Sequence, residues 1–553
     1  MQTSLLDSIE AACLSPDGGG AVTFETAGCR EAFSLAELVT RGEDFWRRCG
    51  PPARRGGDRT LVLIAMSVSP DALGIYLAAI RLGLVPAFLA PMTEKQQAGD
   101  HWSTLEALCR NTCAAVLCVD DAAVADVRAN LDCPELIVAA PSAIPATSGF
   151  DPLQEFQPEP EDVAFLQFSS GTTGLRKAVA ITHGMLDAQI DSYGAALDCR
   201  AGDVMVSWLP LYHDMGLIAC LMLPVLRDMR LVLLDPLEWV RQPRTLFAAI
   251  ARHGGTHCFL PNFAFNHLAL TVPADCADDL SSMRAFVNCS EPCTASAFER
   301  FATRFGDLGV ARGQLRTCYA MAEAVFAVTQ SRPGRSVRAL DELAAPSFTD
   351  GAPIARDVLS SGRPIDGIAV EIRDSEKNPL PDGVVGEIHI AGAMLFDDYA
   401  DTRRAGWTRG PACGGGPAWF ATGDLGLIAE GELFVVGRSK DVIIVNGRNL
   451  LAHEIEAIAS DVPGVKPGRT VAFGSWQDAV GSETLVLLAE PAGPDGGEEE
   501  WRGLSRSLRQ RISERTGVHP TVRIVPPRSL VKTTSGKLCR QRNKHNYENG
   551  LRC

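Results

Sequence analysis

A loop between Phe165 and Lys177 combines the residue types that best suit phosphate binding. The run reads Phe-Leu-Gln-Phe-Ser-Ser-Gly-Thr-Thr-Gly-Leu-Arg-Lys: strand-favouring residues lead into six hydroxyl-bearing or glycine residues, and a basic pair follows. Glycine lets the main chain approach a ligand, and backbone N–H and hydroxyl groups can donate hydrogen bonds to phosphate oxygens. A Ser/Gly/Thr cluster by itself is more often a solvated loop, so other motifs must support the predicted polyphosphate site.

This loop does not have the spacing of the common P-loop, which needs Gly, four residues and then Gly-Lys-Ser/Thr. Counting from Gly171 places Arg176 where the second glycine belongs, and Ala178 follows Lys177. A second candidate, Thr533–Lys537, also lacks the required neighbours on both sides. Ordinary P-loop chemistry is therefore disfavoured.

Six further segments after the loop hold residues that nucleotide chemistry requires. They are 208–216 (Trp-Leu-Pro-Leu-Tyr-His-Asp-Met-Gly), 288–292 (Asn-Cys-Ser-Glu-Pro), 318–323 (Cys-Tyr-Ala-Met-Ala-Glu), 422–424 (Thr-Gly-Asp), 437–438 (Gly-Arg) and 532–537 (Lys-Thr-Thr-Ser-Gly-Lys). Each has an ordinary explanation when taken alone. A Gly-Asp pair is usually a turn, a single histidine is usually structural, and a single carboxylate is usually solvated or paired.

Together these segments cover what nucleotidyl transfer needs. Tyr319 can stack against a purine, and Glu323 can hold Mg²⁺ against phosphates. Asp424 can accept hydrogen bonds from ribose hydroxyls, while Lys537 can supply positive charge as the α-phosphate becomes crowded. The combination predicts nucleotidyl-transfer chemistry.

In this order, and over nearly the whole chain, the segments resemble the adenylate-forming superfamily of acyl-CoA ligases, peptide-synthetase adenylation domains and luciferases. The resemblance implies that a carboxylate attacks the α-phosphate of ATP, which yields an acyl-adenylate and pyrophosphate. It also implies that a thiol accepts the acyl group after a small domain has rotated. ATP and Mg²⁺ are the expected cofactors.

The resemblance assigns a role to individual residues of each motif. The phosphate loop would comprise Ser169, Ser170, Gly171, Thr172, Thr173, Gly174 and Lys177, and the adenine site Ser290, Glu291 and Pro292, with Tyr319 on the base. Further nucleotide contacts would come from Ala320, Met321, Asp424, Arg438 and Lys440, of which Asp424 and Arg438 would hold the ribose and Lys440 would be the hinge. The catalytic residues would be Glu323 as the Mg²⁺ ligand, His213 between the nucleotide and the acyl pocket, and Lys537 as the adenylation lysine.

Within the superfamily the chain is most similar to the fatty acyl-AMP ligases, on the evidence of three segments: 206–217, 260–266 and 445–449. Enzymes of that family pass the acyl-adenylate to the phosphopantetheine thiol of an acyl carrier protein. They also carry an extra segment, whose expected counterpart is Leu340–Leu359. Ala320 departs from the family pattern, since glycine usually follows the tyrosine there.

Two other functions compete with this interpretation. An acyl-CoA synthetase would pass the acyl group to CoA instead of a carrier protein. A nucleotide-binding regulator would have lost catalysis, but retention of Glu323, Asp424, Arg438 and Lys537 together argues against decay, since one loss could cripple the enzyme. The largely apolar stretches 211–223, 262–266 and 322–328 are expected to line the acyl pocket and favour an aliphatic acid.

Alternating apolar and helical segments indicate the scaffold that positions these motifs. Runs such as Leu61–Met66, Ala114–Val119 and Leu231–Leu234 predict buried strands, and Asp71–Leu82 and Pro243–Arg252 predict crossover helices. Short strands between Val370 and Ile390 predict an antiparallel part.

A second, smaller domain is expected after a polar junction at Ser439–Asp441. It should contain strands, a helix at 453–460 and a charged helix at 498–516. We therefore expect an α/β fold in which residues 1–438 form a large N-terminal adenylation domain with two α/β sheet subdomains and a small β subdomain. Residues 439–553 should form a small, mobile α+β C-terminal domain.

Composition narrows the partners and the compartment. The chain has 553 residues and a formal charge of −15, which argues against a general nucleic-acid binder. Its 17 cysteines contain no C-x-x-C pair, so we expect reduced thiols and a cytoplasmic location. The N-terminus shows no signal-peptide pattern. The most apolar stretch, 75–92, is interrupted by Arg81, Gly83 and Pro86 and predicts a buried helix and strand instead of a membrane span.

Overall fold

The chain divides into two compact units in the computed structural model. The structure describes residues 5–14, 20–26, 29–50, 59–91, 98–144, 156–169, 177–273, 275–340, 347–348, 358–396, 419–445, 448–477, 482–493, 497–532 and 538–550. The first unit comprises Met1–Val337, Ser361–Ala369 and Ala391–Ala418, and the second comprises Arg338–Ser360, Val370–Ile390 and Trp419–Cys553. The boundary predicted from the sequence, after Arg438, differs from this division and stays a prediction.

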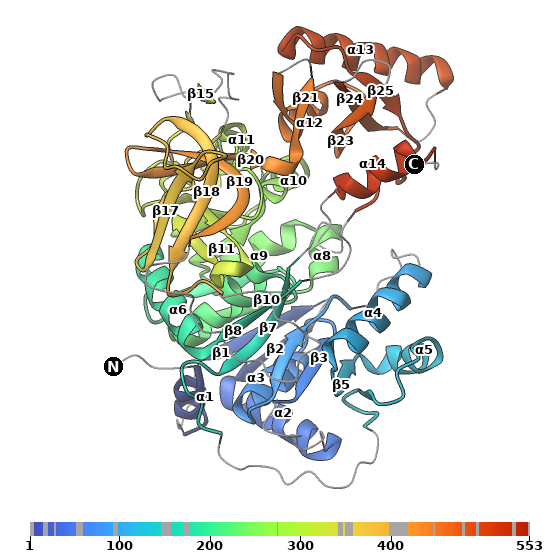
Figure 1. The fold of residues 1–553 in the computed structure, drawn as a ribbon. Coiled ribbons are helices and arrows are strands. Elements are labelled where there is room, and N and C mark those ends of the chain that lie inside the picture. Colours follow the sequence, from blue (N-terminus) through green and yellow to red (C-terminus); the bar gives the residue numbers. More distant parts are fainter. Residues whose placement is uncertain are drawn as a thin grey trace. The chain divides into compact units, whose positions relative to one another are not determined.

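A nine-stranded sheet is the largest sheet of the first unit (Figure 1). Its order is β16-β14-β13-β12-β11-β9-β10-β1-β2. The strands are β1 (Ala21–Thr26), β2 (Cys29–Ser34), β9 (Val204–Ser207), β10 (Arg230–Leu234), β11 (His257–Leu260), β12 (Ala285–Asn288), β13 (Leu315–Ala320), β14 (Ala327–Gln330) and β16 (Arg363–Pro364). Pairing is parallel from β1 through β10, β9, β11 and β12 to β13, and antiparallel where β2 and β14 join.

Helices connect these strands and pack buried apolar side chains into the core. They are α6 (His183–Leu197), α7 (Leu223–Leu226), α8 (Pro236–Arg241), α9 (Arg244–His253), α10 (Asn262–Thr271) and α11 (Ala295–Phe305). In α9, apolar residues at positions 246, 247, 249 and 250 are buried, and Gly254 ends the helix with a φ of 64°. Phe301 of α11 lies within 6.2 Å, between ring centroids, of four other aromatic rings: Phe247, Phe265, Phe286 and Phe305.

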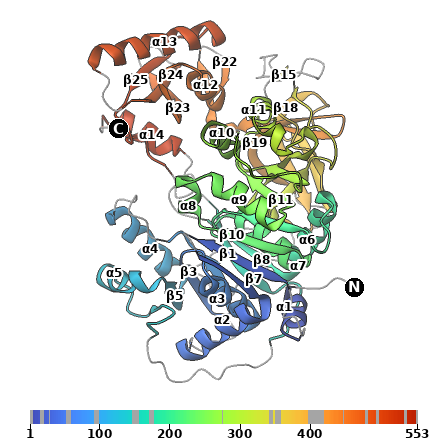
Figure 2. The same ribbon diagram turned by 180° about the vertical axis from the view of Figure 1, so that it is seen from behind.

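A second, smaller parallel sheet in the first unit has the order β4-β3-β5-β6. Its strands are β3 (Leu61–Ala65), β4 (Val85–Phe88), β5 (Val116–Val119) and β6 (Ile137–Ala139). The neighbouring elements are α1 (Leu5–Leu14), α2 (Leu35–Cys49), α3 (Pro70–Arg81), α4 (Ala98–Thr112), α5 (Val124–Asn130) and the hairpin strands β7 (Val163–Ser169) and β8 (Lys177–Thr182). Figure 2 shows α2 and α3 from the other side.

The second unit begins with a mainly antiparallel sheet. It is built from β15 (Ser347–Phe348), β17 (Ile368–Arg373), β18 (Val384–Gly392), β19 (Phe420–Ala429) and β20 (Glu432–Arg438). Leu340 and Val358, at the ends of the segment expected to be an insertion, are buried in the same cluster as Leu427 and Phe434. Composition alone marked this segment as a loop, and most of it lies outside the described residues.

The rest of the second unit is α+β. It contains β21 (Val442–Val445), β22 (Arg448–Leu451), α12 (Ala452–Ser460), β23 (Val465–Gln477), β24 (Ser482–Pro491), α13 (Glu498–Thr516), β25 (Thr521–Ile524) and α14 (Arg540–Glu548). Strand β24 pairs antiparallel with β23 and parallel with β25. The helices expected at 453–460 and 498–516 are confirmed as α12 and α13.

These elements confirm the predicted α/β class, with two α/β sheets in the first unit and a smaller α+β part at the C-terminal end of the chain. Strands β3, β5 and β10 occupy the apolar runs that predicted them, and α3 and α9 occupy the predicted helices. Within the stretch 75–92, residues 75–81 belong to α3 and Val85–Phe88 form β4. Among the helices that the structure describes, none has the length and apolarity needed to cross a membrane. The cysteines in the described residues are free thiols.

Helices α2 and α3 approach each other through two glycines. A Cβ added to Gly42 would overlap the Gly74 carbonyl group, and one added to Gly74 would overlap the Leu38 carbonyl oxygen. We expect Gly42→Ala to destabilise the first unit by about 2 kcal/mol through overpacking. Thermal unfolding followed by circular dichroism measures this. Thr40→Ala on the exposed face of α2 is the control, and equal melting temperatures for the two variants would contradict the predicted contact.

Candidate active site

Several candidate segments begin where parallel strands of the large sheet end. Residues 208–216 follow β9, α10 follows β11, residues 289–293 follow β12 and residues 321–323 follow β13. Since these strands pair in parallel, their carboxyl ends meet at one edge of the sheet. Strand β10, which follows β9 in the chain, lies on one side of β9 in the sheet, and the next strand, β11, lies on its other side. The chain connections therefore diverge at β9. Open α/β sheets bind their ligands at such a switch point.

The segment after β9 holds His213 in place. Its N–H donates to the Pro210 carbonyl at 3.2 Å, and its Nδ1 lies 2.5 Å from Oδ1 of Asp214. The same Asp214 oxygen accepts the Met215 N–H at 2.8 Å, at the start of a π-helix that spans Met215–Met222. Gly216 is required there because a Cβ would overlap the Pro210 carbonyl. The His213 side chain is 22% exposed, so part of the ring is open to a ligand.

The three predicted adenine residues lie together in the loop after β12. Ser290, Glu291 and Pro292 are partly exposed, while Cys289 and Cys293 on either side are buried. Ser290 has a φ of 71°, a left-handed conformation that only a few per cent of non-glycine residues adopt. Burial raises the pKa of the Cys293 thiol well above its ordinary value, so the thiol stays protonated and inert. The cysteines anchor the loop, and the three residues between them are presented outward.

Hydrogen bonds fasten this loop to the start of α10. Asn262 Oδ1 accepts from Nδ2 of the fully buried Asn288 at 2.9 Å and from the Thr294 N–H at 3.4 Å. Glu291 Oε2 accepts from the Phe263 N–H at 3.0 Å. The sequence assigned Asn262 to the acyl pocket and Glu291 to the adenine site. In the structure, hydrogen bonds of these side chains join the start of α10 to the loop after β12. The spacing of the residues in the sequence does not indicate these bonds.

Tyr319 and Glu323 follow each other at the end of β13. Tyr319 pairs with Thr329 of β14 and is 8% exposed, and a β-bulge separates Tyr319 from Ala320. Met321 precedes the 3₁₀ turn Ala322–Ala324, which holds Glu323. The Glu323 carbonyl accepts from the Phe396 N–H at 2.9 Å, and its side chain is partly exposed. The two predicted contacts to base and metal therefore come from one short stretch of backbone.

A strained turn directly after Glu323 is held by a residue that the sequence did not mark. Val325 is fully buried with φ 63° and ψ −56°, and Phe326 N–H donates to Ala324 O at 2.7 Å, which defines a γ-turn. The side chain of Gln189 on α6, also fully buried, accepts from the same N–H at 3.2 Å.

The second unit carries the predicted ribose pair. Asp424 and Arg438 are register partners on β19 and β20, and Arg438 Nε lies 3.2 Å from Asp424 Oδ1. Asp424 N–H donates to Thr422 Oγ1 at 3.1 Å, and Ser439 Oγ donates to the Gly423 carbonyl at 2.9 Å. The Arg438 side chain is 59% exposed while that of Asp424 is 11% exposed. Lys440 lies in the exposed 3₁₀ turn Ser439–Asp441 that follows.

Two predicted loops lie outside the described residues, but their bases are described. Residues 170–176, with five of the predicted phosphate-loop residues, connect β7 and β8, and Ser169 and Lys177 are paired at the mouth of this hairpin. Residues 533–537, with Lys537, are flanked by an antiparallel bridge between Lys532 and Leu538. Each loop therefore begins and ends at paired backbone.

Aromatic side chains gather next to the start of α10. Trp208 and Trp239 stack with centroids 3.6 Å apart, and Phe263 approaches both rings edge-on at 6.4 Å. Phe263 is 41% exposed, whereas Phe265 and Phe326 are fully buried in the core. Of these three phenylalanines, which are expected to line the acyl pocket, Phe263 is the one that offers surface to a ligand.

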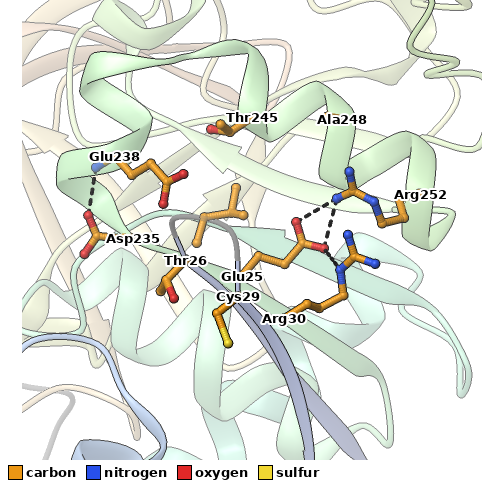
Figure 3. A pocket seen from close by; sticks show the side chains of 10 residues that line it. Glu25, Thr26, Cys29, Arg30, Asp235, Glu238, Thr245, Ala248 and Arg252 are labelled. Atoms are coloured by element: carbon orange, nitrogen blue, oxygen red, sulfur yellow. Dashed lines mark hydrogen bonds and ion pairs between the residues drawn. The ribbon is translucent and has the colours of Figure 1, made fainter.

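A cavity of about 220 Å³ elsewhere in the first unit contains none of the predicted site residues (Figure 3). It lies between the β1–β2 hairpin and helices α8 and α9. Glu25 in its wall accepts hydrogen bonds from Arg30 at 2.8 Å and Arg252 at 2.8 Å, and lies 2.7 Å from His253. Burial alone would raise the pKa of Glu25, but His253 and Arg252 hold it below the usual value. The Glu25 carboxylate in this cavity is therefore already paired with Arg30 and Arg252.

Comparison with known proteins shows the family to which the chain belongs. Residues 54–400, more than half of the chain, match the AMP-binding enzyme family. The chain belongs to the AMP-binding enzymes. The resemblance to the adenylate-forming superfamily, drawn from the motifs, is thereby confirmed.

Relatives within the AMP-binding enzymes cover almost the whole chain. Long-chain-fatty-acid–AMP ligase FadD26 of Mycobacterium marinum is 30% identical over 92% of this chain and 91% of its own length. A solved structure from a study of fatty acyl-adenylate ligases of E. coli and L. pneumophila superposes with a TM-score of 0.85 at 29% identity, covering 99% of this chain and 98% of the other. A protein provisionally named as an acyl-CoA synthetase, from Caulobacter vibrioides, is 31% identical over 70% of this chain and 68% of its length.

Removal of the Asn262 side chain should disturb the predicted adenine loop (residues 289–293) of this AMP-binding enzyme. Asn262→Ala leaves the buried Asn288 amide without its acceptor, at a cost of about 1–3 kcal/mol. We expect a lower melting temperature and a Kd for ATP raised about tenfold, since a tenfold change corresponds to about 1.4 kcal/mol. Calorimetric titration with ATP measures the affinity. Thr271→Ala, an exposed change on the same helix, is the control, and unchanged ATP binding in Asn262→Ala would limit the network to a role in stability.

Proposed function

We propose that this chain activates a fatty acid with ATP to an acyl-adenylate and then transfers the acyl group to the phosphopantetheine thiol of an acyl carrier protein. The observation that carries the proposal is the 30% identity to a long-chain-fatty-acid–AMP ligase over 92% of the chain. Structural similarity to fatty acyl-adenylate ligases over 99% of the chain supports it. A cytoplasmic location, inferred from the many free thiols, is part of the same proposal.

In the first half-reaction an oxygen of the fatty carboxylate attacks the α-phosphorus of ATP, and the bond to the β-phosphate oxygen breaks. The hairpin loop between Ser169 and Lys177 would bind the β- and γ-phosphates with backbone N–H groups and hydroxyls. Ser290, Glu291 and Pro292 would line the adenine, with Tyr319 against the base. Asp424, held by Arg438, would accept hydrogen bonds from the ribose hydroxyls. Lys537 would neutralise charge at the α-phosphate in the transition state.

Glu323 is the proposed Mg²⁺ ligand. The described residues contain no group of three or more acidic, histidine or cysteine side chains placed to hold a metal ion. Mg²⁺ is commonly bound through one or two carboxylates together with substrate phosphates and waters. When bound, the ion would neutralise the phosphate oxygens and the departing pyrophosphate. The partly exposed Glu323 side chain at the carboxyl edge of the sheet meets that requirement.

In the second half-reaction the carrier thiol attacks the acyl carbonyl, a thioester forms and AMP leaves. The thiol must lose its proton, and His213, whose ring is partly open beside Asp214, would accept it. The exposed face of Phe263, next to the Trp208–Trp239 stack, would contact the acyl chain.

A second candidate acceptor is CoA. The observation in its favour is the similarity to the Caulobacter protein provisionally named as an acyl-CoA synthetase. It covers less of the chain than the similarity to FadD26, so the carrier protein is the acceptor that we propose.

The proposal is tested in two stages. ATP–pyrophosphate exchange is measured with a panel of fatty acids of graded length, with aryl-substituted acids and amino acids as controls, and we expect exchange with fatty acids alone. Holo-acyl carrier proteins or CoA are then added, and the products are identified by intact mass and by chromatography. We expect an acylated carrier and no acyl-CoA. ATP binding without exchange for any acid would refute the enzymatic function, and acyl-CoA as the main product would refute the carrier.

Lys537→Ala should nearly abolish adenylation. The loss of one preorganised charge at a transition state costs about 100- to 1,000-fold in rate, so we expect the kcat of exchange to fall by at least about 100-fold. Lys544→Ala on α14, which removes a lysine 3.8 Å from Glu548, is the matched control and should retain normal exchange. A Lys537→Ala enzyme with wild-type exchange would exclude this lysine from the reaction.

A further inference from the structure

The loop that carries Lys537 is clamped at its base. Lys532 and Leu538 form an antiparallel bridge, and Cys539 N–H donates to Val531 O at 3.0 Å. The fully buried Asn543 of α14 accepts from Val531 N–H and donates to Val531 O, both at 3.0 Å, and donates to Cys539 O at 2.8 Å. Both ends of the loop are thereby joined to the first turn of α14.

Arg540, three residues after Lys537, connects this clamp to two distant segments. Its guanidinium donates to both oxygens of Glu456 on α12, at 2.9 and 3.0 Å, and to the Ala472 carbonyl at 2.9 Å. It also forms an ion pair with Asp441, the residue after the proposed hinge Lys440. The planar guanidinium is the side chain suited to hold several acceptors in fixed directions. One cation therefore joins the Lys537 loop, α12 and the hinge.

The network is largely shielded from water. The side chains of Arg540, Glu456 and Asp441 are 21%, 19% and 28% exposed. Burial by itself would lower the pKa of Arg540, but the carboxylates of Glu456 and Asp441 outweigh it and keep the guanidinium charged. Burial raises the pKa of Glu456, and Arg540 opposes that change. Glu456 Oε1 also accepts the Ala472 N–H at 2.9 Å, so the buried carboxylate has partners on both sides.

We propose that Arg540 is a positioning residue for Lys537. Through its ion pair with Asp441, Arg540 joins the lysine loop to the residue that follows the hinge, so that the loop and residue 441 move as one rigid body. This inference rests on the proposed function, in which Lys537 serves adenylation and the chain turns at Lys440. The connection transmits a backbone rotation at residue 440 to the lysine. Without it, the loop could shift relative to the hinge, and a displacement of about 1 Å at a reacting centre can cost about 100-fold in rate.

Asp441→Asn is the most informative variant because it removes one carboxylate and leaves the buried Glu456–Arg540 pair intact. We expect the kcat of ATP–pyrophosphate exchange to fall about tenfold, with the KM values for ATP and the fatty acid within about twofold of wild type. Arg540→Lys, which keeps the charge but not the fork, should retain more activity than Arg540→Gln. Arg509→Gln, an exposed change of the same charge on α13, is the control.

A double variant separates positioning of Lys537 from general loss of structure. In the Lys537→Ala background, Asp441→Asn should lower the residual exchange no further, because the lysine through which it acts is absent. An equal fall in both backgrounds, or a loss expressed in KM instead of kcat, would overturn the inference.

Hydrogen exchange of the full-length protein tests the clamp without reference to catalysis. The amides of Val531 and Cys539 should exchange faster in Arg540→Gln and in Asp441→Asn than in wild type, while amides of β24 keep their protection. Unchanged protection at Val531 and Cys539 would overturn the inference even where exchange activity falls. If the wild-type protein shows no ATP–pyrophosphate exchange with any acid, the proposed function fails, and the amide data still decide whether Arg540 holds the loop.

Discussion

Parallel pairing of β11, β12 and β13 is the constraint on which the predicted nucleotide-binding half of the site depends. Leu260, Asn288 and Thr317 are in register across these three strands, at or near the strand ends. The residues that follow are therefore delivered to one edge of the sheet at the same height. This is why Asn262, two residues beyond Leu260, can reach the Asn288 side chain, and why Glu291 can accept from the backbone of Phe263. A shift of register by one residue would reverse the face of each side chain and remove both bonds.

Two residues with strained backbone conformations lie where this edge presents its side chains. Ser290 and Val325 both have left-handed backbone conformations, at a cost of about 1–3 kcal/mol each. Such conformations persist only where the surroundings determine them. Buried cysteines and the bonds to α10 constrain the loop of Ser290, and Gln189 together with the packed Phe326 constrains the turn at Val325. The stability of the buried sheet and its helices offsets this cost, and the conformations direct the Glu291 and Glu323 segments outward.

Local patterns predicted much of this architecture because they report local physics. Leu61–Ala65 and Leu231–Leu234 are apolar throughout since both faces of a parallel sheet are covered, and α13 occupies the charged stretch 498–516 that predicted it. Contacts between segments far apart in the sequence could not be predicted. Arg540 and Asp441 are 99 positions apart, and Leu340 and Val358 join a core whose other members lie beyond residue 380. Contacts between such distant residues follow no periodic pattern in the sequence, so only the fold reveals them.

The order of the proposed site residues along the chain explains how one protein can both activate the acid and transfer the acyl group. Asp424 and Arg438 precede Lys440, and Lys537 follows it. A rotation at residue 440 therefore can displace the lysine and leave the ribose pair joined to the strands that carry it, since Asp424 and Arg438 are register partners on adjacent strands. The acyl-adenylate would stay bound while the charge that assisted its formation leaves. The same displacement would make room for a thiol at the acyl carbonyl. A rigid link between the lysine loop and residue 441 makes the departure of the lysine and the entry of the thiol a single movement. With a flexible link, the hinge could turn without carrying Lys537 with it.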